Sequence, residues 1–272
     1  MDQFISAIIL GIVEGITEFL PISSTGHLII VNRFVNLTGE FARTFDVVIQ
    51  FGAILSIIVY FRERLFPPAA LRDAITRRRT LDLWSKSVFA VIPALGLGAA
   101  FGEAIEAHLF HPLVVGTMLL AGGIILILVE RRRSSARIDD MASLSYRVAL
   151  AIGLIQCLAM IPGTSRSAAT IIGAMALGCS RRTAAEFSFF LAIPTMLAAS
   201  AYSLLKLETG LTGTQWQVLA TGFVVSFLVA WAVVAFLMNY IRKHDFVPFG
   251  YYRVVLGLLV LGYFGVVLRG GR

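Results

Sequence analysis

Long apolar runs alternate along the chain with short polar and basic stretches. The runs lie at about 45–61, 85–102, 112–130, 184–205, 216–240 and 249–268. Each is close to the roughly 20 residues that a helix needs to cross a bilayer. Helices satisfy their own backbone hydrogen bonds in lipid, and no run shows the residue-by-residue alternation of a membrane β-strand. The pattern therefore predicts six transmembrane helices.

Two further apolar segments, at about 4–35 and 147–178, are interrupted near the middle by Pro, Gly, Ser and Thr. Each half is too short to cross a bilayer. Irregular backbone at membrane depth is tolerated only where it is buried in protein or lines a wet cavity. We therefore predict two re-entrant helical hairpins within an all-α integral membrane protein.

The two interrupted segments resemble each other when the sequence is shifted by 142 residues, which places Ser23 on Ser165. The shift predicts an internal repeat, with one copy at about 1–130 and the other at about 147–272. Each copy would contain one hairpin and three spans. Because three is odd, the second copy must insert upside down, so we predict a single membrane domain with an inverted-topology repeat.

Composition and charge agree with this topology. Of the 272 residues, 58% are hydrophobic and 14% are charged, which excludes an ordinary soluble domain. The predicted spans leave sixteen Lys and Arg residues on one side, and five on the other: Arg33, Arg43, Lys206, Arg269 and Arg272. The richer side is then cytoplasmic, and the basic loops act as topology signals rather than as a nucleic-acid surface. The first hairpin would enter from outside and the second from the cytoplasm.

The first hairpin carries two carboxylates, Glu14 and Glu18, on one face of a helix. Neighbouring carboxylates in a poor dielectric do not both ionise readily unless a cation lies between them. They are candidates for a divalent-metal site for Mg²⁺ or Ca²⁺, or for a general acid/base pair. The alternative is an internal ion pair with an arginine from another helix.

A group of polar side chains, Ser23, Ser24, Thr25 and His27, follows Pro21 directly. Proline suits the first turn of a helix, where free backbone N–H groups and hydroxyls form a cradle for an anion. The alternative is that these hydroxyls only bond back to backbone carbonyl groups. Their position beside two glutamates favours a functional site.

The second hairpin supplies the opposite charge. Arg166 offers a planar set of donors that suits phosphate, and Ser165, Ser167 and Thr170 add hydroxyl donors. One hairpin would present a metal or a base, and the other an arginine with hydroxyls. This combination is typical of phosphoryl transfer.

The motifs Glu-Gly-Ile-Thr-Glu-Phe-Leu-Pro-Ile-Ser-Ser-Thr-Gly-His at 14–27 and Pro-Gly-Thr-Ser-Arg-Ser at 162–167 resemble the two signatures of the bacterial undecaprenyl-diphosphate phosphatases, the bacitracin-resistance family. The resemblance implies hydrolysis of undecaprenyl diphosphate to the monophosphate, which recycles the lipid carrier for peptidoglycan synthesis. It also implies a divalent cation, a bacterial plasma or inner membrane location, and an active site open to the outer face.

The resemblance also implies roles for single residues. Those implied are Glu14 and Glu18 in metal binding or acid/base work, Ser24 or His27 as nucleophile, and Arg166 with Ser165 and Thr170 in phosphate binding. Ser24 is the preferred nucleophile, with His27 or Glu18 activating it, and a phosphohistidine at His27 stays open. A transporter or flippase of polyprenyl phosphates is the alternative function, because inverted repeats with broken helices are a transporter plan. The oligomeric state is left open.

Overall fold

The computed structural model describes residues 2–32, 34–35, 37, 39–132, 136–205 and 210–270. Its helices are α1 (Gln3–Thr17), α2 (Ser24–Val31), α3 (Gly39–Tyr60), α4 (Arg62–Leu65), α5 (Ala74–Leu109), α6 (Pro112–Arg131), α7 (Tyr146–Gln156), α8 (Arg166–Ala176), α9 (Arg181–Leu205), α10 (Gly213–Tyr240) and α11 (Val247–Gly270). Short 3₁₀ turns lie at Pro68–Leu71, Met141–Ser143 and Cys157–Met160. Within the described ranges, an isolated bridge between Ile138 and Cys179 is the only β-type pairing. The all-α prediction is confirmed.

The structure contains five to six candidate membrane-crossing helices, where six were predicted. Within the described residues, α5, α6, α9, α10 and α11 are each long and apolar enough to cross a bilayer. The pair Thr44–Tyr60 and Arg62–Leu71, which bends by 72° at its break, is the sixth candidate when it is counted as one broken span. Much of this apolar surface faces outward, as it must when the solvent is lipid.

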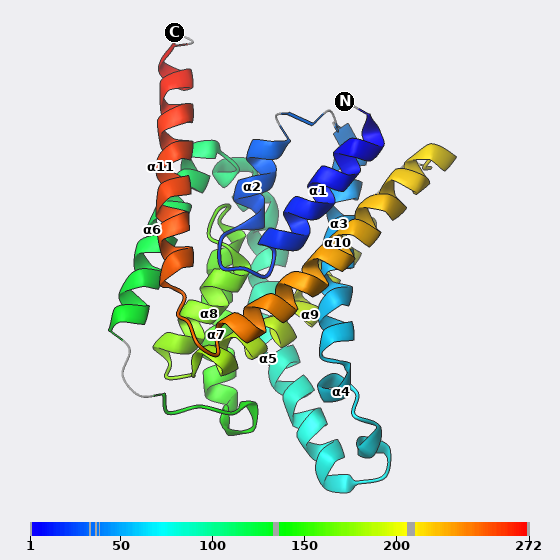
Figure 1. The fold of residues 1–272 in the computed structure, drawn as a ribbon, viewed down its shortest axis with the longest axis vertical. Helices are drawn as coiled ribbons and strands as arrows, with labels where there is room; N and C mark the ends of the chain where they lie inside the picture. Colours follow the sequence, from blue (N-terminus) through cyan, green and yellow to red (C-terminus); the bar gives the residue numbers. More distant parts are fainter. Residues whose placement is uncertain are drawn as a thin grey trace.

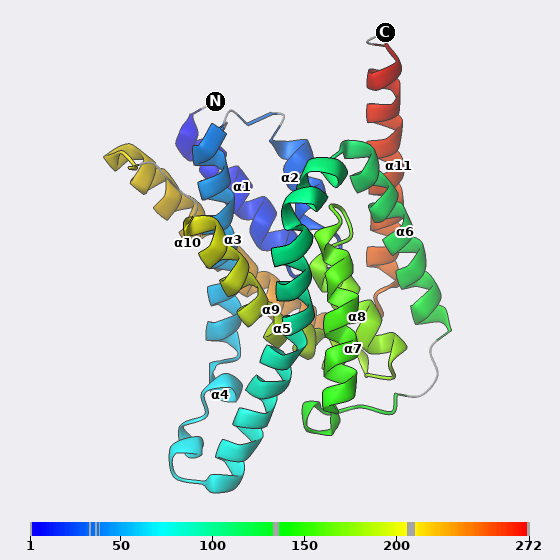
Figure 2. The same ribbon diagram turned by 180° about the vertical axis from the view of Figure 1, so that it is seen from behind.

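The two interrupted segments form helical hairpins that enter the molecule from opposite ends. The first, α1 and α2, descends from the end that carries both termini and turns back near the middle (Figure 1). The second, α7 and α8, rises from the other end with its connecting loop toward the middle (Figure 2). With 15 residues, α1 is about 22 Å long, shorter than a hydrocarbon core of about 30 Å. The first hairpin therefore ends inside the molecule, where Leu20 near its tip contacts Ser167 of the second hairpin.

Helix pairing exchanges elements between the two halves of the chain. The first hairpin packs through α1 on α10, and the second packs through α7 on α5. The remaining major contacts pair α3 with α10, α3 with α9, and α6 with α11. Each hairpin thus packs against the middle span of the opposite half, α10 or α5. This arrangement is expected of an inverted repeat.

Glycines allow the closest of these approaches. A Cβ atom on Gly11 of α1 would lie 2.9 Å from the carbonyl oxygen of Gly222 on α10. The residue 142 positions later, Gly153 of α7, faces α5 in the same way, and a Cβ there would overlap the carbonyl oxygen of Ala90. Small residues at such crossings let helix backbones touch where lipid provides no hydrophobic drive for packing.

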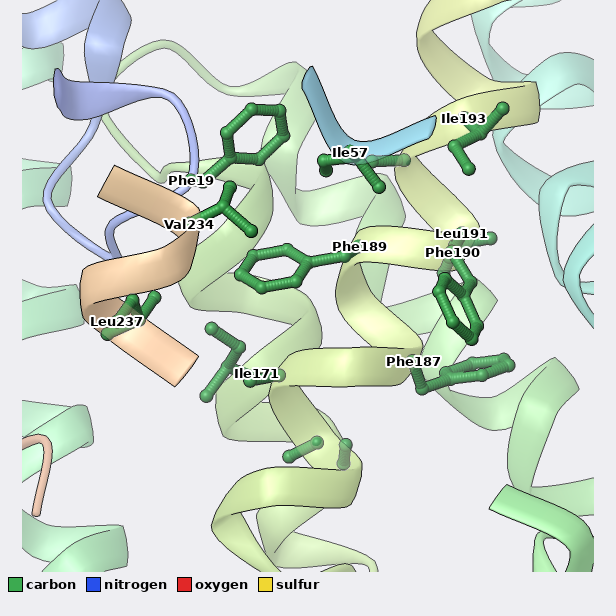
Figure 3. Close-up of a cluster of buried hydrophobic side chains, with 14 of the residues drawn as sticks. Phe19, Ile57, Ile171, Phe187, Phe189, Phe190, Leu191, Ile193, Val234 and Leu237 are labelled. Carbon is green, nitrogen blue, oxygen red and sulfur yellow. The ribbon is translucent and has the colours of Figure 1, made fainter. Parts of the chain in front are cut away.

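The core lies around α9, which is surrounded by protein along most of its length. Its side chains Phe187, Phe189 and Phe190 are buried together with residues of α3, α8, α10 and the first hairpin tip (Figure 3). Phe19, at that tip, meets Phe189 edge to face with ring centroids 5.6 Å apart. Such pairs add to the free energy of plain area burial. The aromatic core thereby holds the broken segment that leads into the first hairpin turn.

The substitution Gly153→Ala tests the hairpin packing. The new methyl group must displace the Ala90 carbonyl, so we expect a loss of about 1–3 kcal/mol in the free energy of unfolding. This loss of stability is detected as a lower apparent melting temperature of the purified protein in detergent. The matched control is Gly96→Ala in α5, where a Cβ has no atom within 4 Å and a small gain is expected. Equal melting of the two variants would contradict this account.

Candidate active site

Each hairpin turn ends at a serine that caps the following helix. Ser23 and Ser165 have positive φ angles of 76° and 69°, the only non-glycine residues in the described chain that do. Their hydroxyls accept from the backbone N–H groups of Gly26 and Ala168, each at 3.3 Å. Left-handed backbone at a non-glycine residue costs about 1–3 kcal/mol and is typical of functional sites. The helix thus begins at Ser24, so Pro21 lies in the turn and not in the first helical turn as expected.

The centre of the site is a short chain of hydrogen bonds that joins the two hairpins. Ser24 Oγ donates to Glu18 Oε2 at 2.6 Å. The other oxygen of the same carboxylate, Oε1, accepts from Arg166 Nη2 at 2.9 Å. Both charged side chains are largely buried, with 7% and 11% of the side-chain surface exposed. The ion pair considered as the alternative role for the carboxylates therefore exists at Glu18, and it brings the two half-sites together.

Arg166 is positioned from several sides. Its Nη1 donates to the carbonyl oxygen of Ser188 on α9 at 3.2 Å. Its guanidinium carbon lies 5.6 Å from the centroid of the Phe19 ring, within range of a cation–π contact. Its Nε is buried and, among the residues that the structure describes, has no hydrogen-bond partner. A buried donor without a partner is uncommon and calls for an explanation such as a missing ligand.

Glu14 lies one helical turn before Glu18 and is only 2% exposed. Its Oε1 is buried without a hydrogen-bond partner among the described residues, and it interacts electrostatically with Glu18 and Asp46. At the corresponding position of the second hairpin, Gln156 finds a partner in Thr195, whose hydroxyl lies 3.2 Å from Nε2. Of these two equivalent positions, Glu14 is the one with a buried oxygen that lacks a hydrogen-bond partner among the described residues.

The donor set at Glu14 suits a hard cation, though protein ligands alone are too few. Over the described residues, no group of three or more His, Cys, Asp or Glu side chains is placed to hold a metal ion. Magnesium commonly binds through one or two carboxylates, with water and phosphate oxygens completing its shell. The pair Glu14 and Glu18 fits that pattern, and their metal role remains a prediction.

His27 is held at both ring nitrogens. Nδ1 lies 2.7 Å from the carbonyl oxygen of Ser23, and Nε2 lies 2.7 Å from the hydroxyl of Tyr252 on α11. The two rings are parallel within 4°, with centroids 5.6 Å apart. A carbonyl oxygen only accepts, so Nδ1 carries a proton; when the ring is neutral, Nε2 accepts from the hydroxyl of Tyr252. Of the two groups considered as activators of Ser24, Glu18 is the one that the described contacts place on it.

The hydroxyls of the second hairpin brace the site. Ser167 Oγ donates to the carbonyl oxygen of Leu20 at 2.8 Å, which ties the second hairpin to the first. Thr170 Oγ1 lies 2.6 Å from Ser188 Oγ. Both residues are 0% exposed, whereas Ser165 is half-buried. The hydroxyls of Ser167 and Thr170 are buried and already have protein partners. Their direct contact with a phosphate remains a prediction.

Thr25 lies in the first turn of α2 and is partly exposed. Together with the capping hydroxyl of Ser23, it borders the same helix N-terminus, where free N–H groups attract an anion. Their part in phosphate binding, like that of Ser165, remains a prediction.

Arg253 is the residue that the sequence interpretation missed. It comes from α11, is 0% exposed, and donates to backbone carbonyls of both hairpin tips: Pro21 at 3.4 Å, Gly163 at 3.2 Å and Thr164 at 3.0 Å, with Met118 of α6 at 3.1 Å. A lone arginine inside an apolar span is a functional candidate by default, and that signal could have identified it. Asp46, near the start of the apolar run 45–61, carried the same signal, whereas Ser188 and Tyr252 carried none.

Comparison with known proteins identifies a family and several relatives that match nearly the whole chain. The family model for the bacitracin resistance protein BacA matches residues 7–259. The chain is 51% identical over 264 residues to undecaprenyl-diphosphatase 1 of Clostridioides difficile (strain 630), covering 96% of each chain. It is 46% identical over 274 residues to an undecaprenyl-diphosphatase of Limosilactobacillus fermentum, covering 98% of this chain and 99% of the relative. An undecaprenyl-diphosphatase of Enterococcus faecalis is 47% identical over 265 residues.

The substitution Arg253→Met tests the bridge between the hairpin tips. It removes the charge, keeps an apolar stem, and leaves several buried carbonyl groups without a donor, so we expect a loss of about 3–5 kcal/mol in stability. The matched control is Arg131→Met, because Arg131 also contacts α11, through Tyr251, but is exposed. Thermal unfolding in detergent compares them. The bridge is refuted if Arg253→Met melts as late as the control.

Proposed function

The chain belongs to the bacitracin resistance protein BacA family and is an undecaprenyl-diphosphatase, and we propose that it hydrolyses its substrate where the two hairpin tips meet. It is a multi-pass membrane protein. The reaction converts undecaprenyl diphosphate and water to undecaprenyl phosphate and inorganic phosphate, which returns the lipid carrier to peptidoglycan synthesis. The observation that carries the location is the hydrogen-bonded chain from Ser24 through Glu18 to Arg166.

Ser24 acts as the nucleophile in this proposal. Its oxygen attacks the terminal phosphorus as its proton passes to Glu18, and the bond to the bridging oxygen breaks. Undecaprenyl phosphate leaves and takes a proton back, and a phosphoserine remains. Water then attacks that phosphorus, Glu18 accepts a proton from the water, and Ser24 leaves with a proton. The 2.6 Å contact supports a base already in hydrogen-bond reach.

Arg166 stabilises charge on the transferring phosphoryl group. Its unpaired Nε supplies a donor beyond the one that positions Glu18. Donors already aimed at the developing charge lower the barrier without reorganisation. Thr25, Ser165 and the N–H groups at the start of α2 and α8 would add further donors.

His27 serves as a positioning residue in this proposal rather than as the nucleophile. Its Nε2, the atom that would attack, already faces the hydroxyl of Tyr252 at 2.7 Å. Its Nδ1 bond to the carbonyl of Ser23 supports the strained cap at which α2 begins.

Glu14 and Glu18 would hold a divalent cation, Mg²⁺ or Ca²⁺, together with phosphate oxygens of the substrate. When bound, such a cation neutralises charge on the diphosphate. The unsatisfied buried oxygen of Glu14 supports this assignment.

The site would open toward the outer face of the bacterial plasma or inner membrane. The first hairpin enters from the end that carries both termini (Figure 1). The basic segments 62–86 and 136–147 lie at the opposite end, which the charge bias makes cytoplasmic. Of the basic residues counted in the topology, Arg33, Arg133, Lys206 and Arg272 lie outside the described residues.

Substitution of Ser24 by Ala tests the nucleophile. We expect phosphate release from a polyprenyl diphosphate to fall by about 10³-fold or more, because the covalent route is lost. Assays on purified wild type and variant in detergent measure it. The matched control is Ser56→Ala, a buried serine bonded only to a backbone carbonyl, which should retain activity.

Trapping with labelled substrate separates the two nucleophiles. An acid-stable phosphoserine that disappears in Ser24→Ala supports the proposal. An acid-labile adduct that persists in that variant would assign the chemistry to His27, and absence of phosphate release by wild type would favour transport.

The substitution Glu14→Gln tests the cation site. It keeps the side-chain shape and removes the charge, so stabilisation of the protein by Mg²⁺ or Ca²⁺ should disappear while the metal-free melting temperature stays the same or rises. Thermal unfolding with and without cation reports binding independently of activity. The control is Glu63→Gln, an exposed carboxylate at the far end of the molecule. Undiminished cation stabilisation in Glu14→Gln would contradict the site.

A further inference from the structure

A polar cavity lies at the basic end of the molecule, away from the hairpin tips. It has a volume of about 550 Å³ and is bounded by the end of α3 with α4, the start of α9 and the last turns of α10. Figure 1 shows α4 and the final turn of α10 in the lower half of the molecule, whereas the first hairpin enters from above. The cavity shares no residue with the candidate active site.

A buried carboxylate organises one wall of this cavity. Glu186 of α9 is 4% exposed and accepts from Arg64 Nη1 at 2.5 Å and from Arg182 Nε at 2.9 Å. The two arginine side chains are 45% and 51% exposed. Each guanidinium therefore uses one N–H toward the protein and leaves other donors facing the cavity. Glu186 fixes the pair in place, so that less freedom is lost when a ligand binds.

Two further arginines add charge that the protein does not balance. Arg62 and Arg242 also line the cavity and, among the described residues, have no side-chain hydrogen bond or ion pair. With Glu63 and Glu186 as the acidic side chains of the lining, four arginines leave an excess of two positive charges. A basic pocket of this kind suits a phosphate group.

Aromatic side chains of α10 and α3 lie exposed beside the arginines of the cavity. Trp231 lines it and is 46% exposed, and Tyr60 at the end of α3 is 36% exposed. On the same helix, a shallow apolar groove is lined by Leu228, Val229, Ala232, Val233 and Phe236. Aromatic side chains at such a position mark the membrane interface. A ligand that contacts both the arginines and the exposed apolar surface of α10 has a charged head and an apolar chain.

We propose that this cavity binds the phosphate headgroup of an anionic membrane phospholipid, with its acyl chain along the exposed apolar surface of α10. The basic segment at this end had an ordinary explanation in membrane topology. That explanation requires no polar cavity, no buried carboxylate that holds two arginines, and no exposed aromatic side chain beside them. The bound lipid would join α3, α9 and α10 at the end of the molecule opposite the active site.

Short-chain phosphatidylglycerol, added to the purified full-length protein in detergent, tests the proposal. A thiol-reactive fluorogenic dye reports unfolding, because Cys179 is buried and Cys157 is partly buried. A lipid that binds only the folded protein raises the melting temperature in proportion to its affinity. We expect phosphatidylglycerol to do so, and phosphatidylcholine and inorganic phosphate at equal concentrations not to.

The double variant R62Q/R242Q locates the site. Neither arginine has a side-chain partner among the described residues, so the variant should melt like wild type without lipid. It should need roughly tenfold more phosphatidylglycerol for the same shift, because two cations near the headgroup are gone. The matched control is R72Q/R77Q, two exposed arginines at the same end but outside the cavity, which should respond as wild type does.

Three results would overturn the proposal. The first is an equal response of wild type to phosphatidylcholine, which would mean that the headgroup charge is not recognised. The second is an equal response to inorganic phosphate, which would mean a free-anion site. The third is an unchanged lipid response of R62Q/R242Q. Phosphate release plays no part in these readouts, so their failure is independent of the proposed catalytic mechanism.

Discussion

Two broken hairpin tips meet inside a membrane protein, and their backbone carbonyl groups require hydrogen-bond donors that lipid does not supply. Arg253 meets this constraint. From α11 it donates to Pro21 of one tip and to Gly163 and Thr164 of the other. The seryl caps and the Glu18–Arg166 pair all depend on this close approach, because each lies within a few residues of a carbonyl that Arg253 binds.

The two hairpins have the same frame and different chemistry. Ser23 and Ser165, 142 residues apart, adopt the same rare backbone conformation and cap the next helix in the same way. The next residue is Ser24 in one copy and Arg166 in the other, and both reach the same carboxylate, Glu18. Inverted packing thus places a hydroxyl and a guanidinium on either side of one carboxylate. A repeat with identical side chains would not place opposite charges together there.

Most of the fold was predictable, because membrane depth restricts the chain to helices and makes every interruption conspicuous. Five spans, the bent pair that is the candidate sixth, and both hairpins follow from apolar length and from the breaks at Pro21 and Pro162. Candidate residues Glu18, Ser24 and Arg166 were also identifiable, since ionisable groups in apolar sequence are rare. The bracing roles of Ser167 and Thr170 were not, because the same hydroxyls could serve a ligand or a neighbouring carbonyl and only packing distinguishes these partners. The parallel stacking of His27 on Tyr252 joins residues 225 positions apart and left no local signal.

The sequence by itself determined the class of the protein, its spans and the chemical inventory of its motifs, because periodicity, length and residue type are local properties. Only the tertiary structure decided which groups meet: Glu18 with Arg166 and Ser24, His27 with Tyr252 instead of with Ser24, and Arg253 with both tips. The physical reason is that hydrogen bonds and ion pairs act over a few ångströms. The distances between side chains on different helices are set by how the two repeats pack, which no local pattern encodes.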